Sequence, residues 1–250
     1  MARQKAQKTT RTTQSSKPSR STVNSEANAK RHPFHIEFLT QAQKMAWGAF
    51  EQHDVLFLLG SAGSGKTFLA CAFAISEILA KRKKKIVLTR PVVEAGESLG
   101  YLPGDMHEKL DPYMMPMYDC IERCVGTEGP QKEIIDRSVE VAPIAYQRGR
   151  TFSDSVCIFD EAQNATEKQL KLFLTRFGQN SKVIITGDPL QSDLHPSQRG
   201  LMNVVRKLED LPGIGIIYFK PNSIVRHPLI ASILERLDDK EEENAASSSK

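Results

Sequence analysis

The segment from Gly60 to Thr67 constrains this 250-residue chain more than any other feature. Its sequence, GSAGSGKT, fits the phosphate-binding loop pattern G-x-x-x-x-G-K-[ST] at every constrained position. The glycines let the backbone curl so that successive N–H groups converge on phosphate oxygens, and the following helix adds the positive end of its dipole. We therefore expect a nucleoside triphosphate site formed by Gly60, Ser61, Ala62, Gly63, Ser64, Gly65, Lys66 and Thr67.

Two of these residues have side chains with specific expected roles. Lys66 is expected to reach the β and γ phosphates, and the Thr67 hydroxyl to ligate Mg²⁺. The flanking segments fit, because 55–59 is an apolar run typical of a strand buried on both faces and 66–80 has the apolar spacing of a packed helix. The alternative is a glycine-rich turn that binds nothing, which would not require a lysine at position 66.

Short apolar runs alternate with helical patterns along the middle of the chain, which is typical of βαβ units and a parallel sheet. The sequence predicts strands at 55–59, 86–89, 139–142, 156–159, 183–186 and 214–219. It predicts helices at 41–50, 66–80, 167–177, 198–208 and 229–237. Thr40 is expected to cap the first helix, and Thr166 with Gln169 to form a capping box. The fold class is therefore α/β, with a mainly parallel sheet and helices on both faces.

The two ends of the chain differ from its middle in charge. Residues 1–31 carry eight Lys and Arg against one Glu and almost no large apolar side chains, so we expect a disordered basic tail. This tail is either a solubilising segment or an arm that tracks RNA or DNA phosphates. Residues 32–240 are expected to form one domain, and 241–250 a flexible C-terminal tail. Without a signal region or a long apolar run, a cytoplasmic location and no membrane partner are expected.

The four cysteines indicate no metal centre. Cys71 and Cys157 lie in a predicted helix and a predicted strand, where each is expected to be a small buried residue. Cys120 and Cys124 are spaced as a metal or redox pair would be, but no second Cys or His pair completes a zinc set.

A phosphate loop requires an acidic element at the end of a neighbouring strand. Asp160 and Glu161 directly follow the apolar run 156–159. We expect Asp160 to hold Mg²⁺, directly or through water, and Glu161 to orient or deprotonate the water that attacks the γ phosphate. The alternative is that both residues only cap the next helix.

Three further segments resemble motifs of nucleic-acid helicases. Residues 160–163 (DEAQ) resemble motif II, and residues 183–191 (VIITGDPLQ) resemble motif III. In the second segment we expect Thr186, Asp188 and Gln191 to lie beside the γ phosphate, with Gln191 sensing its loss. Gln43, in a segment that resembles the adenine-reading glutamine motif, is either that reader or a solvent-facing residue of an amphipathic helix.

Together with these motifs, other segments resemble the PhoH family of P-loop ATPases over residues 37–237. They are 89–91 (TRP), 94–97 (EAGE), 102–105 (LPGD), 146–151 (YQRGRT) and 224–228 (IVRHP). The resemblance implies a RecA-like ATPase core related to the first lobe of superfamily 1 helicases, with ATP and Mg²⁺ as its cofactors. It also implies a role in RNA handling or in the phosphate-starvation response.

An arginine that neutralises charge in the transition state is expected to complete the site. Because 250 residues leave no room for a second lobe, we expect it from a neighbouring subunit or from the C-terminal segment folding back. Arg226 is the leading candidate, followed by Arg148 and Arg150; each could instead be a surface or ion-paired arginine. This predicts a homo-oligomer with head-to-tail contacts, for which a ring such as a hexamer would suffice.

The sequence thus predicts an ATP-binding and ATP-hydrolysing enzyme, with RNA or single-stranded DNA as the candidate partner. Two alternatives remain open. One is a processive RNA or DNA helicase, and the other is a nucleotide-gated binding or assembly protein with negligible turnover.

Overall fold

The structure is a computed structural model that describes residues 34–91 and 106–220. For residues 106–110 it describes the backbone only. The two predicted tails, the predicted helix at 229–237 and Arg226 lie outside the described residues. All described residues belong to one compact unit.

Six strands form a single sheet in which every neighbouring pair is parallel. Their order across the sheet is β3-β2-β4-β5-β1-β6. The strands are β1 Val55–Gly60, β2 Lys85–Thr89, β3 Val139–Val141, β4 Ser155–Phe159, β5 Lys182–Gly187 and β6 Ile214–Phe219. All six predicted strands are confirmed, with ends that differ by at most one residue.

Six α-helices lie in the described part of the chain, and four of them were predicted from the sequence. They are α1 Gln41–Gln52, α2 Lys66–Leu79, α3 Met106–Val125, α4 Pro130–Asp136, α5 Glu167–Leu174 and α6 Leu201–Leu208. The Thr40 cap of α1 and the capping box of Thr166 and Gln169 are confirmed.

Two helix ends differ from the prediction by three residues, and the ends of α1 and α2 differ by one or two. The predicted helix 167–177 ends at Leu174, because the chain then turns so that Phe177 can bridge Phe152 beside β4. The predicted helix 198–208 begins only at Leu201, because Pro196–Gln198 forms a separate 3-10 turn and Gly200 starts the helix.

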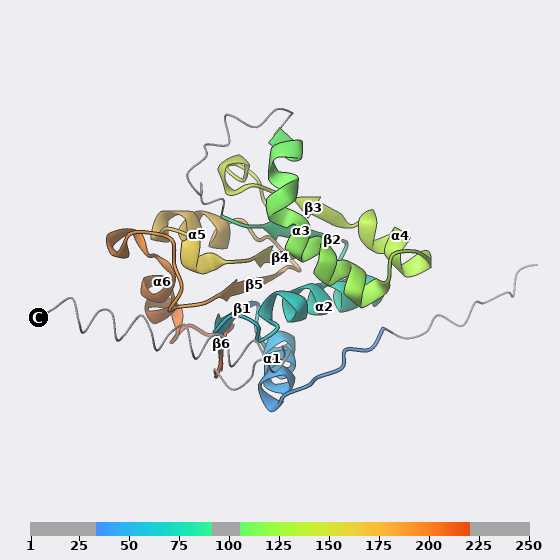
Figure 1. The fold of residues 1–250 in the computed structure, drawn as a ribbon, viewed down its shortest axis with the longest axis horizontal. Coiled ribbons are helices and arrows are strands. Elements are labelled where there is room, and N and C mark those ends of the chain that lie inside the picture. Colours follow the sequence, from blue (N-terminus) through green and yellow to red (C-terminus); the bar gives the residue numbers. More distant parts are fainter. Residues whose placement is uncertain (1–33, 92–105, 221–250) are drawn as a thin grey trace, which may run out of the picture. The chain divides into compact units, whose positions relative to one another are not determined.

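The helices cover both faces of the sheet, as Figure 1 shows. Alternate residues of each strand point to opposite faces. Leu56 and Leu58 of β1 pack with α1, α2 and α3, whereas Phe57 and Leu59 pack with α5 and α6. This is a RecA-like α/β fold.

The parallel arrangement brings the carboxyl ends of the strands to one edge of the sheet. The phosphate loop follows β1, Arg90 follows β2, Asp160 follows β4, and Asp188 follows β5. Adjacent ends are joined by the backbone, since the Asp160 N–H donates to the Thr89 carbonyl oxygen at 2.9 Å. Binding sites in such sheets form outside these strand ends, so the candidate site is expected here.

Candidate active site

The phosphate loop connects β1 to α2 through three glycines in backbone conformations that L side chains rarely adopt. Their φ angles are 145° at Gly60, 82° at Gly63 and 83° at Gly65. Gly60 is also crowded, because a Cβ there would lie 2.4 Å from the carbonyl oxygen of Phe219 in β6. The curled loop therefore depends on glycine at these positions.

Lys66 folds its ammonium group back over this loop. Its Nζ donates to the carbonyl oxygens of Gly60 at 2.7 Å and of Ser61 at 2.9 Å. The buried Ser64 hydroxyl lies 3.5 Å from the same Nζ and donates to the Ser61 carbonyl oxygen at 2.9 Å. The positive charge of Lys66 is thus held at the loop, and its contact with phosphates stays a prediction.

Two hydroxyl groups converge on the carboxylate of Asp160. Thr67 Oγ1 donates to Asp160 Oδ1 at 2.8 Å, and Thr186 Oγ1 donates to the same oxygen. Asp160 is 1% exposed and Thr186 is 1% exposed, so water does not compete strongly for these groups. The loop, β4 and β5 therefore meet at one carboxylate.

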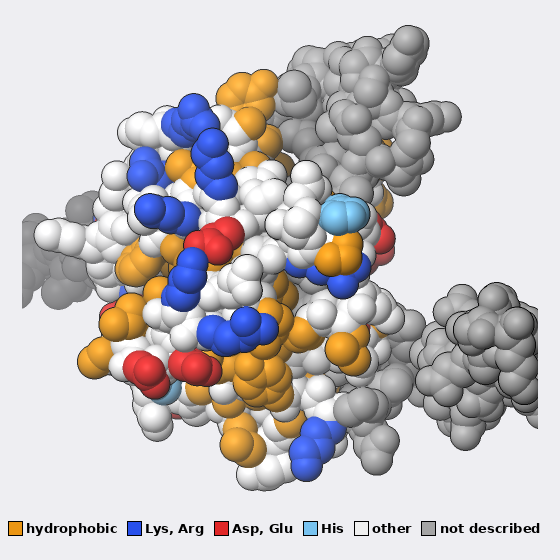
Figure 2. All heavy atoms as spheres, turned by 90° about the vertical axis from the view of Figure 1, so that its left-hand side faces the viewer, with side chains coloured by type: hydrophobic (Ala, Val, Ile, Leu, Met, Phe, Trp, Pro, Cys, Tyr) orange, Lys and Arg blue, Asp and Glu red, His pale blue; other side chains and the backbone are white. Residues whose placement is uncertain are grey.

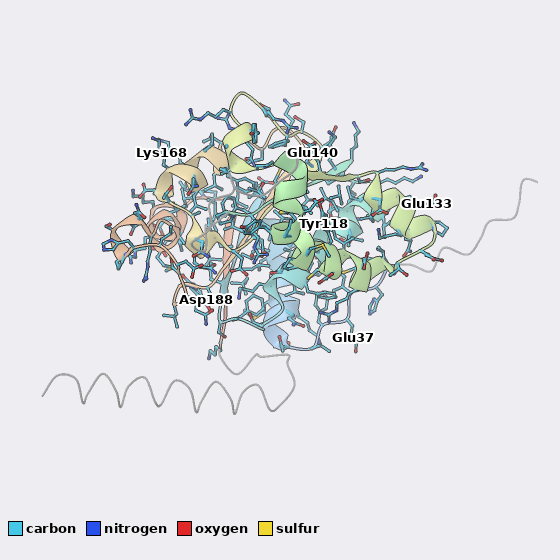
Figure 3. The ribbon with its side chains drawn as sticks, turned by 45° about the horizontal axis from the view of Figure 1, so that its top comes forward. Glu37, Tyr118, Glu133, Glu140, Lys168 and Asp188 are labelled. Carbon is cyan, nitrogen blue, oxygen red and sulfur yellow. The ribbon has the colours of Figure 1, made fainter. Side chains whose placement is uncertain are left out.

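Glu161 lies beside Asp160 in a strained backbone conformation. Its φ of 56° and ψ of 42° are left-handed, which is uncommon for a non-glycine residue and clusters at functional sites. Its Oε2 accepts a hydrogen bond from Gln163 Nε2 at 2.5 Å. Gln163 Oε1 in turn accepts the backbone N–H of Asp188 at 3.0 Å, so Glu161 is linked to the end of β5, where Figure 3 labels Asp188.

Arg90 is a site residue to which the sequence analysis assigned no role. Its Nε lies 3.9 Å from Asp160 Oδ2, and its Nη2 lies 3.5 Å from Glu161 Oε1. Its position directly after β2 was a usable signal only once β2 was known to pair with β4.

The end of β5 and the turn after it contribute unequally to the site. Thr186 and Gly187, the last two residues of β5, line a cavity over the phosphate loop, and the carboxylate of the buried Asp188 accepts the Leu190 N–H in a tight turn. Gln191 is exposed and is not among the residues that line this cavity. Its role as a γ-phosphate sensor stays a prediction.

A cavity of about 640 Å³ lies over the loop and extends toward the segment before α1. Gln43 lines it and is 5% exposed, with its Oε1 accepting the Leu39 N–H at 2.7 Å. A Cβ at Gly65 would lie 3.4 Å from Gln43 Nε2, so the amide lies against the phosphate loop. The structure thus places Gln43 inside the cavity, and its reading of adenine stays a prediction.

Helix α3 forms the other wall of this cavity through Cys120, Arg123 and Cys124. The Arg123 guanidinium lies 5.2 Å from the ring centroid of Phe68, the residue that follows Thr67. A hydrogen bond from the buried Cys71 thiol lowers the pKa of Cys120, whereas burial raises the pKa of Cys124 to about 12. Within the described ranges, no three His, Cys, Asp or Glu side chains are placed to hold a metal ion together.

The family model for PhoH-like protein matches residues 35–238 of this chain. The chain belongs to the PhoH-like family. Curated relatives are a PhoH-like protein of Bacillus subtilis, 44% identical over 212 residues, and Protein PhoH of Escherichia coli K12, 42% identical over 192 residues. The matches cover 84% and 76% of this chain and 66% and 54% of those two proteins, so the chain spans roughly half to two thirds of their length.

Solved structures with a similar fold are more distant. The Pif1 helicase from Candida albicans is 17% identical with a TM-score of 0.38, covering 74% of this chain and 40% of that chain. The Sulfolobus solfataricus SWI2/SNF2 ATPase core in complex with dsDNA is 13% identical with a TM-score of 0.42, covering 63% of this chain and 34% of that chain.

The arginines proposed to complete the site of this PhoH-like chain have different surroundings. Arg226 lies outside the described residues. Arg150 pairs with Glu140, which is labelled in Figure 3, and its guanidinium lies 4.6 Å from the ring centroid of Phe152. Arg148 is exposed. Arg150 therefore has the ion-paired surroundings that the sequence analysis gave as its alternative role.

For the residues that the structure describes in this PhoH-like chain, no helix is both long and apolar enough to cross a membrane.

The basic run 81–85 lies at the opposite ends of the strands from the phosphate loop, and side chains of this run form ion pairs with nearby residues. Lys84 contacts Asp154 at 2.7 Å and Lys85 contacts Glu140 at 3.1 Å. The run is therefore a surface loop with local ion pairs.

Proposed function

We propose that this PhoH-like chain binds ATP with Mg²⁺ and hydrolyses it to ADP and phosphate. In this proposal the N–H groups of the phosphate loop bind the phosphates, and Lys66 places its charge beside the β and γ phosphates. Glu161 orients the attacking water or accepts its proton. Gln43 contacts the adenine, Gln191 senses the γ phosphate, and Arg226 supplies the neutralising charge.

The observation that carries the proposal is the 2.8 Å hydrogen bond between Thr67 Oγ1 and Asp160 Oδ1. It joins the helix that follows the loop to the acidic end of β4, so the residues to which we assign phosphate binding and hydrolysis lie in one cluster. A glycine-rich turn with only a structural role would not require a carboxylate at this point.

The donor set at this cluster fits Mg²⁺, which prefers hydroxyl and carboxylate oxygens and keeps several of its waters. Thr67 and Asp160 are the residues that would hold it. Mg²⁺ neutralises charge on the phosphate oxygens when it is bound with the nucleotide. The protein's own contribution is to hold these two oxygen ligands together and to exclude other water from them.

Phosphate release from ATP tests this proposal. The parent is expected to release phosphate in the presence of Mg²⁺, and this release is expected to stop when EDTA is added. The Lys66→Ala variant is expected to lose both ATP binding and phosphate release. Lys44→Ala, at an exposed position of α1, is the matched control and should behave as the parent. A parent that binds ATP but shows no turnover, with or without nucleic acid, would support the alternative of a nucleotide-gated binding or assembly protein.

The proposed nucleic-acid partner, RNA or single-stranded DNA, has one supporting feature in the structure. Lys and Arg side chains gather on the face formed by α5 and α6, which Figure 2 views directly. Exposed cations there include Lys168 and Lys171 of α5 and Arg206 of α6. A positive face attracts phosphates without reading sequence.

Phosphate release with and without RNA and single-stranded DNA, on the full chain and on a chain lacking residues 1–31, tests this coupling. Stimulation that is lost with the basic tail assigns the contact to the tail, and stimulation that persists assigns it to the domain. Strand separation in the same assays would support the processive helicase.

The proposed homo-oligomer follows from the need for an arginine such as Arg226 at the site. Light scattering with ATP and Mg²⁺ is expected to give a mass of several subunits, with a ring such as a hexamer as one outcome. A monomeric mass together with full ATPase activity would contradict the oligomer.

A further inference from the structure

Arg90 occupies a position from which one side chain reaches both acidic residues of the site. It directly follows β2, and β2 pairs with β4 in the register Thr89 to Phe159. Asp160 and Glu161 directly follow Phe159, the last residue of β4. Arg90 therefore lies beside the acidic pair because of the strand order and not because of proximity in sequence.

The three nitrogens of the Arg90 guanidinium each face a different group. Nη1 donates to the carbonyl oxygen of Tyr113 in α3 at 2.9 Å. Nη2 lies 3.5 Å from Glu161 Oε1, and Nε lies 3.9 Å from Asp160 Oδ2. The two carboxylate contacts are longer than strong hydrogen bonds, so they act mainly through charge, whereas the carbonyl of α3 fixes the position of the group.

This charge is sheltered, which makes it more effective than a surface cation. The Arg90 side chain is 21% exposed and that of Asp160 is 2% exposed. Ion pairs between fully exposed side chains are screened by water and contribute little, but partly buried pairs are screened less.

Glu161 requires support from its neighbours because its side chain is 37% exposed and its backbone is left-handed. Its two carboxylate oxygens face different partners. Oε2 accepts from Gln163, which the N–H of Asp188 fixes in turn, and Oε1 faces Arg90. The direction of the carboxylate is thus set from both sides.

We propose that Arg90 is a positioning residue that aims the Glu161 carboxylate at the attacking water, with α3 holding the arginine in place. This inference rests on the proposed function, in which Glu161 orients or deprotonates that water. Because Arg90 acts through Glu161, its loss should slow the chemical step and leave nucleotide binding intact.

The test combines turnover with nucleotide binding in three single variants of the full chain. Arg90→Ala is expected to lower kcat by about 10- to 100-fold, the scale of a misplaced catalytic group, and to leave the dissociation constant of a fluorescent ATP analogue unchanged. Arg90→Lys keeps the cation without the three-way contact and is expected to recover part of the rate. If Arg90→Ala does not fold, the rate of Arg90→Lys tests whether the three-way contact of Arg90 is needed for full turnover. Arg137→Ala removes an arginine that is 83% exposed and should leave the rate at that of the parent.

A double variant separates positioning from a general structural role. In single-turnover measurements, Arg90→Ala added to Glu161→Gln is expected to cause no further loss below the residual rate of Glu161→Gln. Losses that multiply, or an Arg90→Ala variant with the parent's kcat, would overturn the inference. If Glu161→Gln itself turns over as the parent does, the proposed function fails instead, so the two failures are distinguishable.

Discussion

The Thr67 hydroxyl of α2 donates a 2.8 Å hydrogen bond to the carboxylate of Asp160, which lies 93 positions later in the chain. Thr186, from a third element, donates to the same carboxylate oxygen. The order β4-β5-β1 brings these elements together, because β5 lies between the strand of the loop and the strand of the acidic pair. The sheet therefore fixes the distance between the candidate metal ligands.

Thr67→Ala tests the metal role of this contact. Loss of one oxygen ligand is expected to raise the Mg²⁺ concentration for half-maximal phosphate release by at least about tenfold. Thr67→Ser retains the hydroxyl and should stay close to the parent. An unchanged Mg²⁺ dependence in Thr67→Ala would show that its hydroxyl does not ligate the ion.

Gln43→Ala tests whether the buried amide reads adenine. Loss of hydrogen bonds from a buried amide is expected to weaken ATP binding by about five- to tenfold, with little effect on GTP. Calorimetric titration with both nucleotides measures this, and Gln52→Ala, at the exposed end of the same helix, is the control. Equal losses for ATP and GTP would assign Gln43 a structural role instead.

Gly200→Ala tests the close approach of α6 to α5. A Cβ at this position would lie 2.1 Å from the backbone nitrogen of Glu167, so the backbone must move. We expect a loss of about 2–4 kcal/mol in the free energy of unfolding by urea. Gly48→Ala in α1 meets nothing within 4 Å and should instead stabilise the protein by about 0.5–1 kcal/mol. Equal stability of the two variants would contradict this packing.

The thiols should differ in their reaction with iodoacetamide. A hydrogen bond with Cys71 lowers the pKa of Cys120, so the thiolate fraction of Cys120 at pH 8 is larger than that of an ordinary thiol. Burial raises the pKa of Cys124 and that of Cys157 to about 12, so both remain protonated there. Peptide mass spectrometry should find Cys120 modified before the other cysteines. Because Cys120 lines the cavity, its modification should slow when ATP and Mg²⁺ are present. Earlier modification of Cys157 would contradict the described burial.

The strands and the phosphate loop could be predicted because their signals are local. An apolar run such as 55–59 specifies a buried strand regardless of its partners. Helix α3 was missed because Pro112 and Pro116 lie inside it, and proline normally ends a helix. Packing overrides this cost, since Met114, Met117 and Ile121 recur on one face and are buried in the core.

The Met- and Tyr-rich segment 111–118 permits two interpretations from sequence, either as core or as a base-stacking or subunit surface. The burial of Met114 and Met117 confirms the core interpretation for these two residues, whereas Met115 is 51% exposed. Arg90 could not be assigned from sequence, because its contacts depend on β2 lying beside β4. Strand order is a property of the whole sheet, and no local pattern specifies it.

The Glu161→Gln variant tests the central claim most directly. It replaces the carboxylate with an amide of the same shape, so ATP binding should be unchanged, while phosphate release should fall by about 10²- to 10⁴-fold, the typical contribution of a general base. Glu133→Gln, at a carboxylate that is 72% exposed on α4, is the control and should hydrolyse ATP as the parent does. A Glu161→Gln variant that binds ATP normally and releases phosphate at the parent's rate would contradict the assignment of this site as hydrolytic.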